Sequence, residues 1–445
     1  MEKKENKITP ELASGFRDYL PEDMIPRQRM FDTIRGVFER FGFIPLDTPA
    51  LEKEEILTGG DENFRMHIFK TNVKVGEEKL ALRFDLTVPL ARVIAQYPNE
   101  IKKPFKRYQV GPVWRAEKPQ AGRFREFTQF DADIVGSASM MADAEIISVM
   151  YETMTALGIS NFLIKVNNRK ILNGLAEYAG FSSEKNVTVL RMIDKLDKQG
   201  WDEVQKELID CGLELIEAEA IKKFVSIKNS NKEEILGLVE SLMKKSATAL
   251  EGIAELREIL NYTQALGVPD DSWEIDLSVA RGLGYYTGAV FETILQDLPS
   301  FGSVFSGGRY DGLVEKFSPN SVPATGASVG VDRLFVALKE LKLVRPIKTV
   351  AQVIILNFDK TCEVTCLKTA NVLRKAQVST EIYLGQETTL KGQLAYAVRN
   401  EAPVVIIIGS IELQKGFAQI KDMKARKQSL ERDSDLVLKV KEILK

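Results

Sequence analysis

Apolar residues near the start of the chain recur at helical spacing. Between Met30 and Phe38 they fall on one side of a helix written over residues 21–42, and Gly42 stands where that helix would end. Residues 43–51 are extended and interrupted by two prolines, which is typical of an edge or interface strand. This part of the chain therefore predicts a helix followed by a strand that does not lie in the middle of a sheet.

The clearest strand pattern is a hairpin between Tyr108 and Gly136. Its first arm, Tyr108–Glu117, is apolar and aromatic, and Lys118–Gly122 contains the Pro and Gly of a turn. The second arm alternates from Phe124 onward, and its polar parity carries Arg125, Gln129, Asp131 and Asp133. Because successive strand side chains point to opposite faces, one face of this hairpin is polar. Such a face either meets water or forms the floor of a ligand site.

Local charge favours the second alternative. From Ile101 to Arg125 there are eight Lys or Arg residues against one acid, Glu117, although the net charge of the 445-residue chain is only −2. A cluster of cations beside a polar strand face favours a phosphate-bearing ligand. The near-neutral total excludes a protein that is basic throughout, so any contact with nucleic acid would come from local patches.

The remaining pattern predicts three further parts. Residues 169–267 lose strand character and take up helical periodicity with many Lys and Glu, which indicates a helical module inserted between β-rich segments. Strands return at Trp273, and glycine-rich turns are expected at 280–284 and 306–313, before a small-residue strand leads into a helix near Arg333. After a linker at 341–349, residues 350–445 alternate strands and helices, as a separate domain with a mostly parallel sheet does.

The amino-acid composition excludes several classes of active site. The chain has a single histidine, His67, and three cysteines, which is too few for a Ser–His–Asp hydrolase, a histidine-rich metal cluster or a disulfide framework. Cations, carboxylates, amides and hydroxyls therefore carry the chemistry, as suits phosphoryl or nucleotidyl transfer. No signal peptide and no run of about 18 apolar residues is found, so we expect a cytoplasmic protein without a membrane anchor. The glycine-rich runs match neither a P-loop nor a dinucleotide fingerprint.

Five segments together resemble the histidyl-tRNA synthetases, a family of class II aminoacyl-tRNA synthetases. They are LRFDLTVP, the hairpin VWRAEKPQAGRFREFTQFDADIVG, ARGLGYYTGAVFE, SGGRYDGL and GASVGVDRL. The resemblance covers nearly the whole chain in the right order. It implies an α+β fold: an antiparallel sheet flanked by helices, with a helical insertion and a C-terminal α/β anticodon-binding domain.

On this resemblance we expect five parts. They are the first part of a catalytic domain at 1–168, the helical insertion at 169–267, the second part of the catalytic domain at 268–340, the linker at 341–349 and the anticodon-binding domain at 350–445.

The resemblance also implies roles for single residues. For ATP, which would arrive with Mg²⁺, Arg115 meets the α-phosphate, Glu117 the adenine, and Arg333 the γ-phosphate and adenine. Arg281 resembles the catalytic arginine, and both it and Arg115 also border the histidine. The α-amino group of L-histidine falls to Asp85, Thr87 and Gln129, and its imidazole to Asp133, Tyr285 and Tyr286. The loop with Lys118, Gln120 and Arg123 resembles the one that meets the acceptor end of tRNA(His).

The implied activity is that of a histidine–tRNA ligase that works as a homodimer. Two positions depart from the family pattern: Gly284 stands where many members have an acid, and Thr128 where His or Tyr is common. A second interpretation is a regulatory subunit of ATP phosphoribosyltransferase, which shares the catalytic-like fold and senses histidine. Such proteins usually lack the C-terminal domain and nucleotide-binding residues, both of which this chain keeps. An RNA-binding protein with a dead site would be expected to lack Arg115, Arg281 or Arg333, and ARGLGYYTG disfavours a proline- or threonine-specific synthetase.

Overall fold

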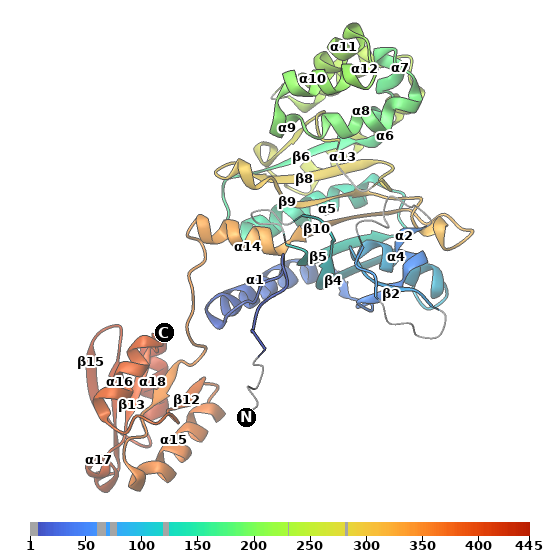
Figure 1. The fold of residues 1–445 in the computed structure, drawn as a ribbon. Coiled ribbons are helices and arrows are strands. Elements are labelled where there is room, and N and C mark those ends of the chain that lie inside the picture. The colour runs from blue at the N-terminus through green and yellow to red at the C-terminus, as the bar shows by residue number, and fades with distance from the viewer. Residues whose placement is uncertain (1–7, 60–67, 72–77, 119–123, 230, 281–283) are drawn as a thin grey trace, which may run out of the picture. The chain divides into compact units, whose positions relative to one another are not determined.

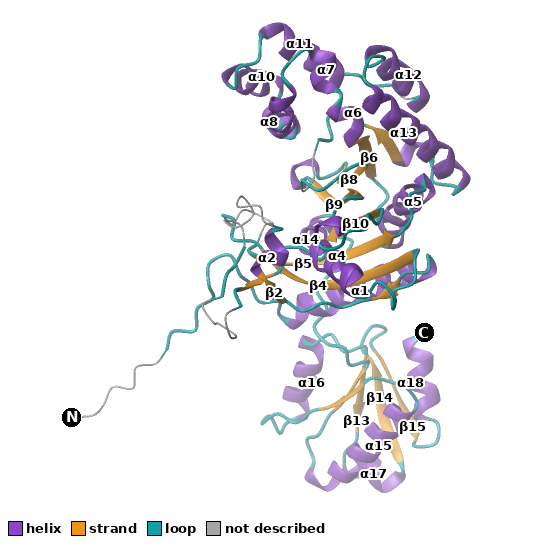
Figure 2. Ribbon diagram, turned by 90° about the vertical axis from the view of Figure 1, so that its right-hand side faces the viewer, coloured by secondary structure: helices purple, strands orange, loops and turns teal. Residues whose placement is uncertain are grey.

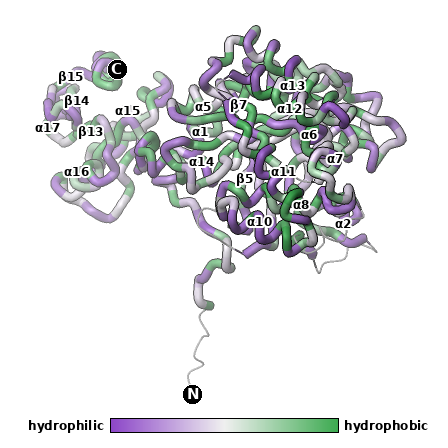
Figure 3. The backbone as a smooth tube through the Cα atoms, turned by 90° about the horizontal axis from the view of Figure 1, so that it is seen from above, coloured by the Kyte–Doolittle hydropathy of each residue, from purple (hydrophilic) through white to green (hydrophobic). Residues whose placement is uncertain are grey.

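The computed structural model describes residues 8–59, 68–71, 78–118, 124–229, 231–280 and 284–445. The chain divides into two compact units. One contains Met30–Val344 and the segment that ends at Arg17; the other contains Asp18–Arg29 and Arg345–Lys445. Each unit has hydrophobic segments of its own and a separate buried core (Figure 3).

The first unit is built on an eight-stranded sheet with the order β1-β4-β5-β10-β9-β8-β6-β7 (Figure 1). The inner pairs are antiparallel, and only the two outermost pairs, β1 with β4 and β6 with β7, are parallel. The strands are β1 (Ile44–Pro45), β4 (Phe105–Trp114), β5 (Glu126–Val135), β6 (Phe162–Asn168), β7 (Trp273–Ile275), β8 (Ala289–Leu295), β9 (Ser303–Arg309) and β10 (Ala324–Gly330). A small sheet pairs β2 (Leu51–Lys53) with β3 (Leu80–Leu82).

Apolar faces of helices cover this sheet. The second half of α1 (Pro21–Arg40) places Phe38 against Phe130 of β5, with ring centroids 5.1 Å apart. The long helices α5 (Met140–Ala156) and α13 (Ala247–Ala265) pack side by side (Figure 2). The shorter helix α14 (Val331–Glu340) contacts β5, β9 and β10, whereas α2 (Glu54–Thr58) and α4 (Thr87–Gln96) pack against each other beside the small sheet. The apolar parity predicted for the second hairpin arm is buried in this core, as Phe130, Ala132 and Ile134 show.

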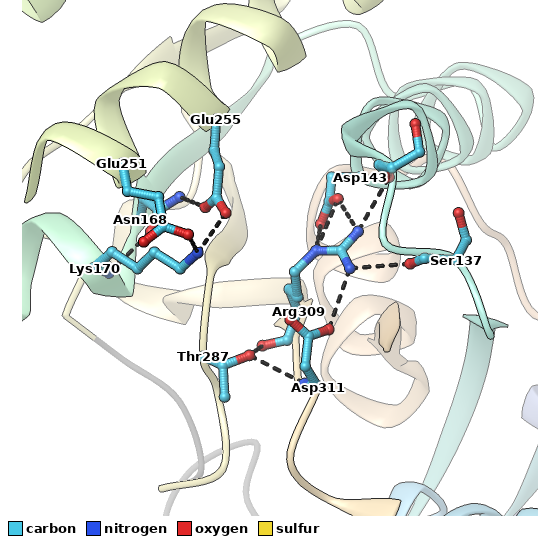
Figure 4. A network of polar contacts seen from close by, with 10 residues as sticks. Ser137, Asp143, Asn168, Lys170, Glu251, Glu255, Thr287, Arg309 and Asp311 are labelled. Atoms are coloured by element: carbon cyan, nitrogen blue, oxygen red, sulfur yellow. Dashed lines mark hydrogen bonds and ion pairs between the residues drawn. The ribbon is translucent and has the colours of Figure 1, made fainter. Parts of the chain in front are cut away.

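Helices fill the segment between β6 and β7. They are α6 (Arg169–Asn173), α7 (Leu175–Ala179), α8 (Asn186–Ile193), α9 (Leu196–Gln199), α10 (Trp201–Asp210), α11 (Leu215–Val225), α12 (Lys232–Leu242) and α13. Lys170 of α6 bonds to Glu251 and Glu255 of α13, both at 2.6 Å, so the first and last helices of the segment are tied together (Figure 4). The helical insertion expected from the sequence is present.

The second unit carries a five-stranded sheet with the order β12-β11-β13-β14-β15. The three strands β11 (Val353–Ile355), β12 (Thr380–Ile382) and β13 (Val404–Ile407) are parallel, and β14 (Phe417–Asp422) and β15 (Lys427–Arg432) add an antiparallel hairpin. Its helices are α15 (Glu363–Lys375), α16 (Leu390–Arg399), α17 (Ser410–Lys415) and α18 (Leu436–Leu444). The parallel strands predicted for this region are present, but the last two of the four strand pairs are antiparallel.

Two local predictions are wrong. Residues 306–309 are not a turn but the end of β9, and their glycines allow close approach of strands. A Cβ on Gly307 would lie 2.0 Å from the Gly326 carbonyl oxygen of β10, and one on Gly308 would lie 2.5 Å from the Ala289 carbonyl oxygen of β8. The β-rich run at 79–90 predicts that Asp85 and Thr87 share one face of a strand, but Thr87 begins α4, whose first turn donates the Val88 N–H to the Asp85 carboxylate at 3.0 Å.

A buried cation holds the chain that leads into β8. Arg309 forms an ion pair with Asp143 of α5 and donates to the Ser137 carbonyl at 3.0 Å (Figure 4). Its own carbonyl accepts the Thr287 N–H at 2.8 Å, and the Thr287 hydroxyl accepts the Asp311 N–H at 3.0 Å. The residues just after Tyr286 are therefore fixed to the sheet. None of the described helices is both long and apolar enough to cross a membrane.

Candidate active site

Two adjoining cavities open on the polar face of the sheet. The first is lined by residues that include Arg115, Glu117, Phe127, Asp332 and Arg333. The second, of about 330 Å³, is lined by residues that include Asp85, Asp131, Asp133, Tyr285 and Tyr286. Both cavities are bordered by Arg115, Gln129, Ser303, Ser306, Ser328 and Arg333. Because strands β5, β9 and β10 lie next to one another in the sheet, residues far apart in the sequence meet at this boundary.

Arg115 is held at the boundary by the end of the hairpin. Its backbone N–H donates to the Arg125 carbonyl at 2.8 Å, which continues the pairing of the two arms beyond β4. The side-chain Nε donates to the Phe84 carbonyl at 3.2 Å, and the guanidinium carbon lies 5.0 Å from the centre of the Phe127 ring. Both contacts fix the cation in place before any ligand arrives.

The first cavity is polar and carries charge of both signs. Glu117 is exposed at its edge, and Arg333, in the first turn of α14, donates to the Ser303 carbonyl of β9. Asp332 accepts from the Thr128 N–H of β5 and from Arg17 at 3.2 Å. The Asp332 carboxylate therefore joins α14 to β5 beside Arg333.

The second cavity has buried carboxylates and phenols. Asp85 is 1% exposed, and its Oδ2 lies 3.5 Å from the Tyr285 hydroxyl. The rings of Tyr285 and Tyr286 meet edge to face at 5.0 Å between centroids. Thr87, also buried, lines the same cavity, so the structure brings Asp85, Thr87 and the tyrosine pair together as the sequence predicted.

Asp133 lies on β5, and each of its carboxylate oxygens already has a partner. Its Oδ2 lies 2.9 Å from Nη2 of Arg107, and its Oδ1 accepts a hydrogen bond from the Tyr310 hydroxyl. Gln129, at the other end of this polar row, donates its amide to the Ser328 hydroxyl at 2.8 Å. Between Gln129 and Asp133 lies Asp131, which is 1% exposed.

Burial dominates the electrostatics of this cavity. It raises the pKa of Asp85 to about 6, although the nearby Arg115 charge and the Val88 N–H lower it. It also raises the pKa of Asp131 to about 7; Arg107 lowers this pKa and the neighbouring Asp133 charge raises it. The pKa of the Tyr285 and Tyr286 phenols is raised above the ordinary value for the same reason, so both stay protonated. The second cavity therefore collects acceptors suited to a ligand rich in N–H donors.

Some predicted site residues cannot be placed. Arg281, Gln120 and Arg123 lie outside the described residues, as does the single histidine, His67. Lys118 is exposed and lines neither cavity.

Other residues at the site were not predicted. The lining also includes Asp131, Asp194, Glu292, Ser306, Tyr310 and Ser328. Arg107 directly faces Asp133 in the register of β4 with β5, so counting back from the hairpin turn would have found it.

Known proteins of one family match this chain over nearly its whole length. The histidyl-tRNA synthetase family model matches residues 15–334, and an anticodon binding domain model matches residues 352–443. A histidine–tRNA ligase of Clostridium tetani is 42% identical over 431 residues, covering 96% of each chain. One of Wolinella succinogenes is 44% identical over 425 residues, covering 95% of this chain and 96% of the relative. The crystal structure of a histidyl-tRNA synthetase from Nostoc sp. superposes with a TM-score of 0.87 at 33% identity, covering 98% of this chain and 100% of that one.

Proposed function

The chain belongs to the histidyl-tRNA synthetase family, and on that basis we propose how its two cavities divide the reaction. The activity is that of a histidine–tRNA ligase, which uses ATP to convert L-histidine to histidyl-adenylate and then transfers the histidyl group to the 3′ end of tRNA(His). We assign ATP to the first cavity and histidine to the second. The observation that carries this assignment is the shared boundary, where Arg115 borders both.

In the first step the histidine carboxylate attacks the α-phosphorus of ATP. A bond forms between carboxylate oxygen and phosphorus, and the bond to the bridging oxygen breaks, so that pyrophosphate leaves. Arg115, held by the Phe84 carbonyl, meets the α-phosphate, and Arg333 meets the γ-phosphate and adenine. ATP enters with Mg²⁺ bound to its phosphates. A cation fixed in advance stabilises the charge that develops without having to reorganise.

The remaining predicted residues take the roles that the family resemblance implies. Glu117 at the edge of the first cavity meets the adenine. Asp85, Thr87 and Gln129 hold the α-ammonium group, for which buried acceptors are suited. Asp133, Tyr285 and Tyr286 shape the imidazole end. Arg281 acts at the α-phosphate from the segment between Ala280 and Gly284.

We assign two separate parts of the chain to tRNA contact. We assign the acceptor end of tRNA(His) to the loop with Lys118, Gln120 and Arg123, and the anticodon to the domain at 350–445. The hairpin of β14 and β15 supports the second assignment, because Lys424, Arg426 and Lys427 are exposed at its tip. The domain limits predicted at 168, 267, 340 and 349 are retained in this proposal.

We further propose a homodimer that pairs through the region of α1 and the following strand. In support, β1 is an edge strand, and Ile44 of β1 and Leu51 of β2 are 53% and 43% exposed. The cytoplasm is the proposed compartment, since ATP and tRNA meet there.

Amino-acid-dependent exchange between ATP and pyrophosphate tests the proposed function. Each of the twenty amino acids is supplied separately to the full-length protein. Exchange with histidine alone is expected. If histidine binds but supports no exchange, the protein acts as a histidine sensor of the regulatory-subunit type, and the division of the cavities proposed here fails.

A further inference from the structure

The carboxylate of Asp131 is buried beyond what its protein neighbours compensate, because burial raises its pKa more than Arg107 and Ser328 lower it. It lies in the middle of β5, lines only the second cavity, and is 1% exposed. Within the described part of the chain, neither of its oxygens has a hydrogen-bond partner in normal geometry. The Ser328 hydroxyl that faces it across the strand pair accepts the Gln129 amide, and its own proton is the nearest protein donor, which lowers the pKa of Asp131 only in part. Burying a carboxylate without partners is costly, so such a group in a cavity indicates a ligand that supplies the donor.

The neighbouring Asp133 differs in this respect. Arg107 lies against one of its oxygens and the Tyr310 hydroxyl donates to the other. A ligand N–H that approached Asp133 would have to displace one of these or share its oxygen. Asp131 offers both oxygens, so it is the better acceptor of the two for a new hydrogen bond.

Position along β5 decides which part of histidine Asp131 meets. Gln129 borders both cavities, so it marks the end of histidine that carries the carboxylate and the α-ammonium group. Asp131 lies two residues farther into the second cavity, and two residues of strand span about 6.8 Å. That is comparable to the distance between the carboxylate and the ring of histidine. Asp85 and Thr87, on a different element, remain for the α-ammonium group.

We propose that Asp131 accepts a hydrogen bond from a ring N–H of bound histidine and is a specificity-determining residue beside Asp133. This inference rests on the proposed function, and it adds a residue to the imidazole end of the cavity. Other carboxylates and phenols of the cavity hold and shape the ring, whereas Asp131 would select for a ring that donates a proton in its direction. A ring that lacks the N–H would leave the buried acceptor unpaired.

The charge state of Asp131 gives a second readout. Titratable, charged or hydroxyl groups that act on it are Arg83, Asp85, Arg107, Asp133, Tyr286 and Ser328. Because burial raises its pKa above the unfolded value, the ionised group costs stability at a pH above the folded pKa. Asp131→Asn should therefore raise Tm in the absence of ligand at pH 8, and this gain should shrink toward pH 5. A residue that serves only the fold would lower Tm when replaced.

Steady-state exchange tests the contact, with the full-length Asp131→Asn variant compared with Glu126→Gln. Glu126 is an exposed acid on the same strand and outside both cavities, so it controls for loss of an acid from β5. We expect the KM for histidine to rise at least tenfold in Asp131→Asn, with the KM for ATP within twofold of wild type and Glu126→Gln unchanged. A histidine KM within twofold of wild type in Asp131→Asn would overturn the inference.

A structure of the wild-type protein with histidine keeps the inference falsifiable should the variant not fold. An Asp131 oxygen within about 3.2 Å of a ring nitrogen supports it, and a separation beyond about 4 Å overturns it. Exchange by the wild-type protein distinguishes failure of the proposed function from failure of the Asp131 contact. If wild type shows no histidine-dependent exchange, the proposed function fails and takes the inference with it. If wild type is active and Asp131→Asn keeps its histidine KM, the inference alone fails.

Discussion

Arg107 and Asp133 form an ion pair of 2.9 Å inside the sheet, and their side chains are 0% and 3% exposed. They face each other across β4 and β5, so the pair joins the two arms of the hairpin beneath the second cavity. Removal of one partner of such a pair leaves the other charge buried without compensation.

Arg107→Met should therefore lower the free energy of unfolding by about 3–5 kcal/mol, as measured by denaturant titration. Arg35→Met is the matched control, because Arg35 also pairs with an aspartate, Asp32, at 2.8 Å but with side chains 35% and 58% exposed. Its loss should cost less than about 1 kcal/mol. Equal effects of the two substitutions would show that burial of the Arg107 pair is not what makes it matter.

Close packing of strands makes Gly307 irreplaceable. An added Cβ would meet backbone atoms of β10 at 2.0 and 2.5 Å, and strand backbone cannot move aside as a flexible side chain can. Gly307→Ala should lower the free energy of unfolding by about 1–3 kcal/mol or more, again by denaturant titration. Gly312→Ala, where nothing lies within 4 Å of an added Cβ, should be nearly neutral. A neutral Gly307→Ala would contradict the strand spacing described here.

Lowering the pH should decrease kcat/KM for histidine. The pKa of Asp85 is raised to about 6 and that of Asp131 to about 7 by burial, so lowering the pH from 8 to 6 protonates most of Asp131 and part of Asp85 in the free enzyme and removes acceptors. We expect kcat/KM for histidine to fall over this range, because that ratio reports ionisations of the free enzyme and free substrate. Histidine itself titrates near about 6.5. Asp131→Asn should flatten the upper part of the profile; an identical slope in wild type and variant would argue against Asp131 as the titrating group.

Arg281 is the residue with the largest expected effect on chemistry. Replacing it by Ala should cut the adenylation rate at least about a hundredfold, since a cation aimed at developing charge is typically worth about 3–4 kcal/mol. Single-turnover adenylate formation measures the effect, and circular dichroism checks that the variant is folded. Adenylation at a near-normal rate would remove Arg281 from the proposed mechanism.

The hairpin of β14 and β15 allows tRNA contact to be separated from adenylation. Reversing two exposed charges, Lys424→Glu with Lys427→Glu, should raise the KM for tRNA in aminoacylation at least tenfold at low salt, because counterion release is lost. Histidine-dependent exchange should stay within twofold of wild type. The same double reversal at Lys244 and Lys245 of the helical insertion is the control, and an equal effect there would point to a general loss of positive charge.

Much of the fold could be read from periodicity. The alternation along β5 predicted which of its side chains enter the core and which line the cavities, because a strand has only two faces. The helices between β6 and β7 and the parallel strands of the second unit followed from equally regular patterns. The predictions that failed concern Ser306–Gly308 and Thr87. Glycines serve a tight turn or a tight strand pair equally well, and only the partner strand decides between them.

The site could be predicted only in part, because long-range contacts leave little trace in local pattern. Asp85, Gln129 and Asp133 were found from family motifs, and the structure brings them to one cavity. Tyr310 was missed because its partner, Asp133, lies far away in sequence and the residues before it had been interpreted as a turn. Asp131 was visible on the polar parity of the hairpin, but its lack of partners could be recognised only once its neighbours were in place.

The segment from Arg169 to Ser272 leaves the sheet from β6 and returns at β7, and these two strands pair with each other at one edge. Because that pairing is parallel, the segment leaves at the carboxyl end of β6 and has to cross back to the amino end of β7. Its last helix, α13, packs against α5 and β6, so in evolutionary terms only the helices between α6 and α13 could be exchanged without uncovering the sheet. For protein engineering, α6 and α13, which Lys170 ties together, are the natural place to graft a foreign domain.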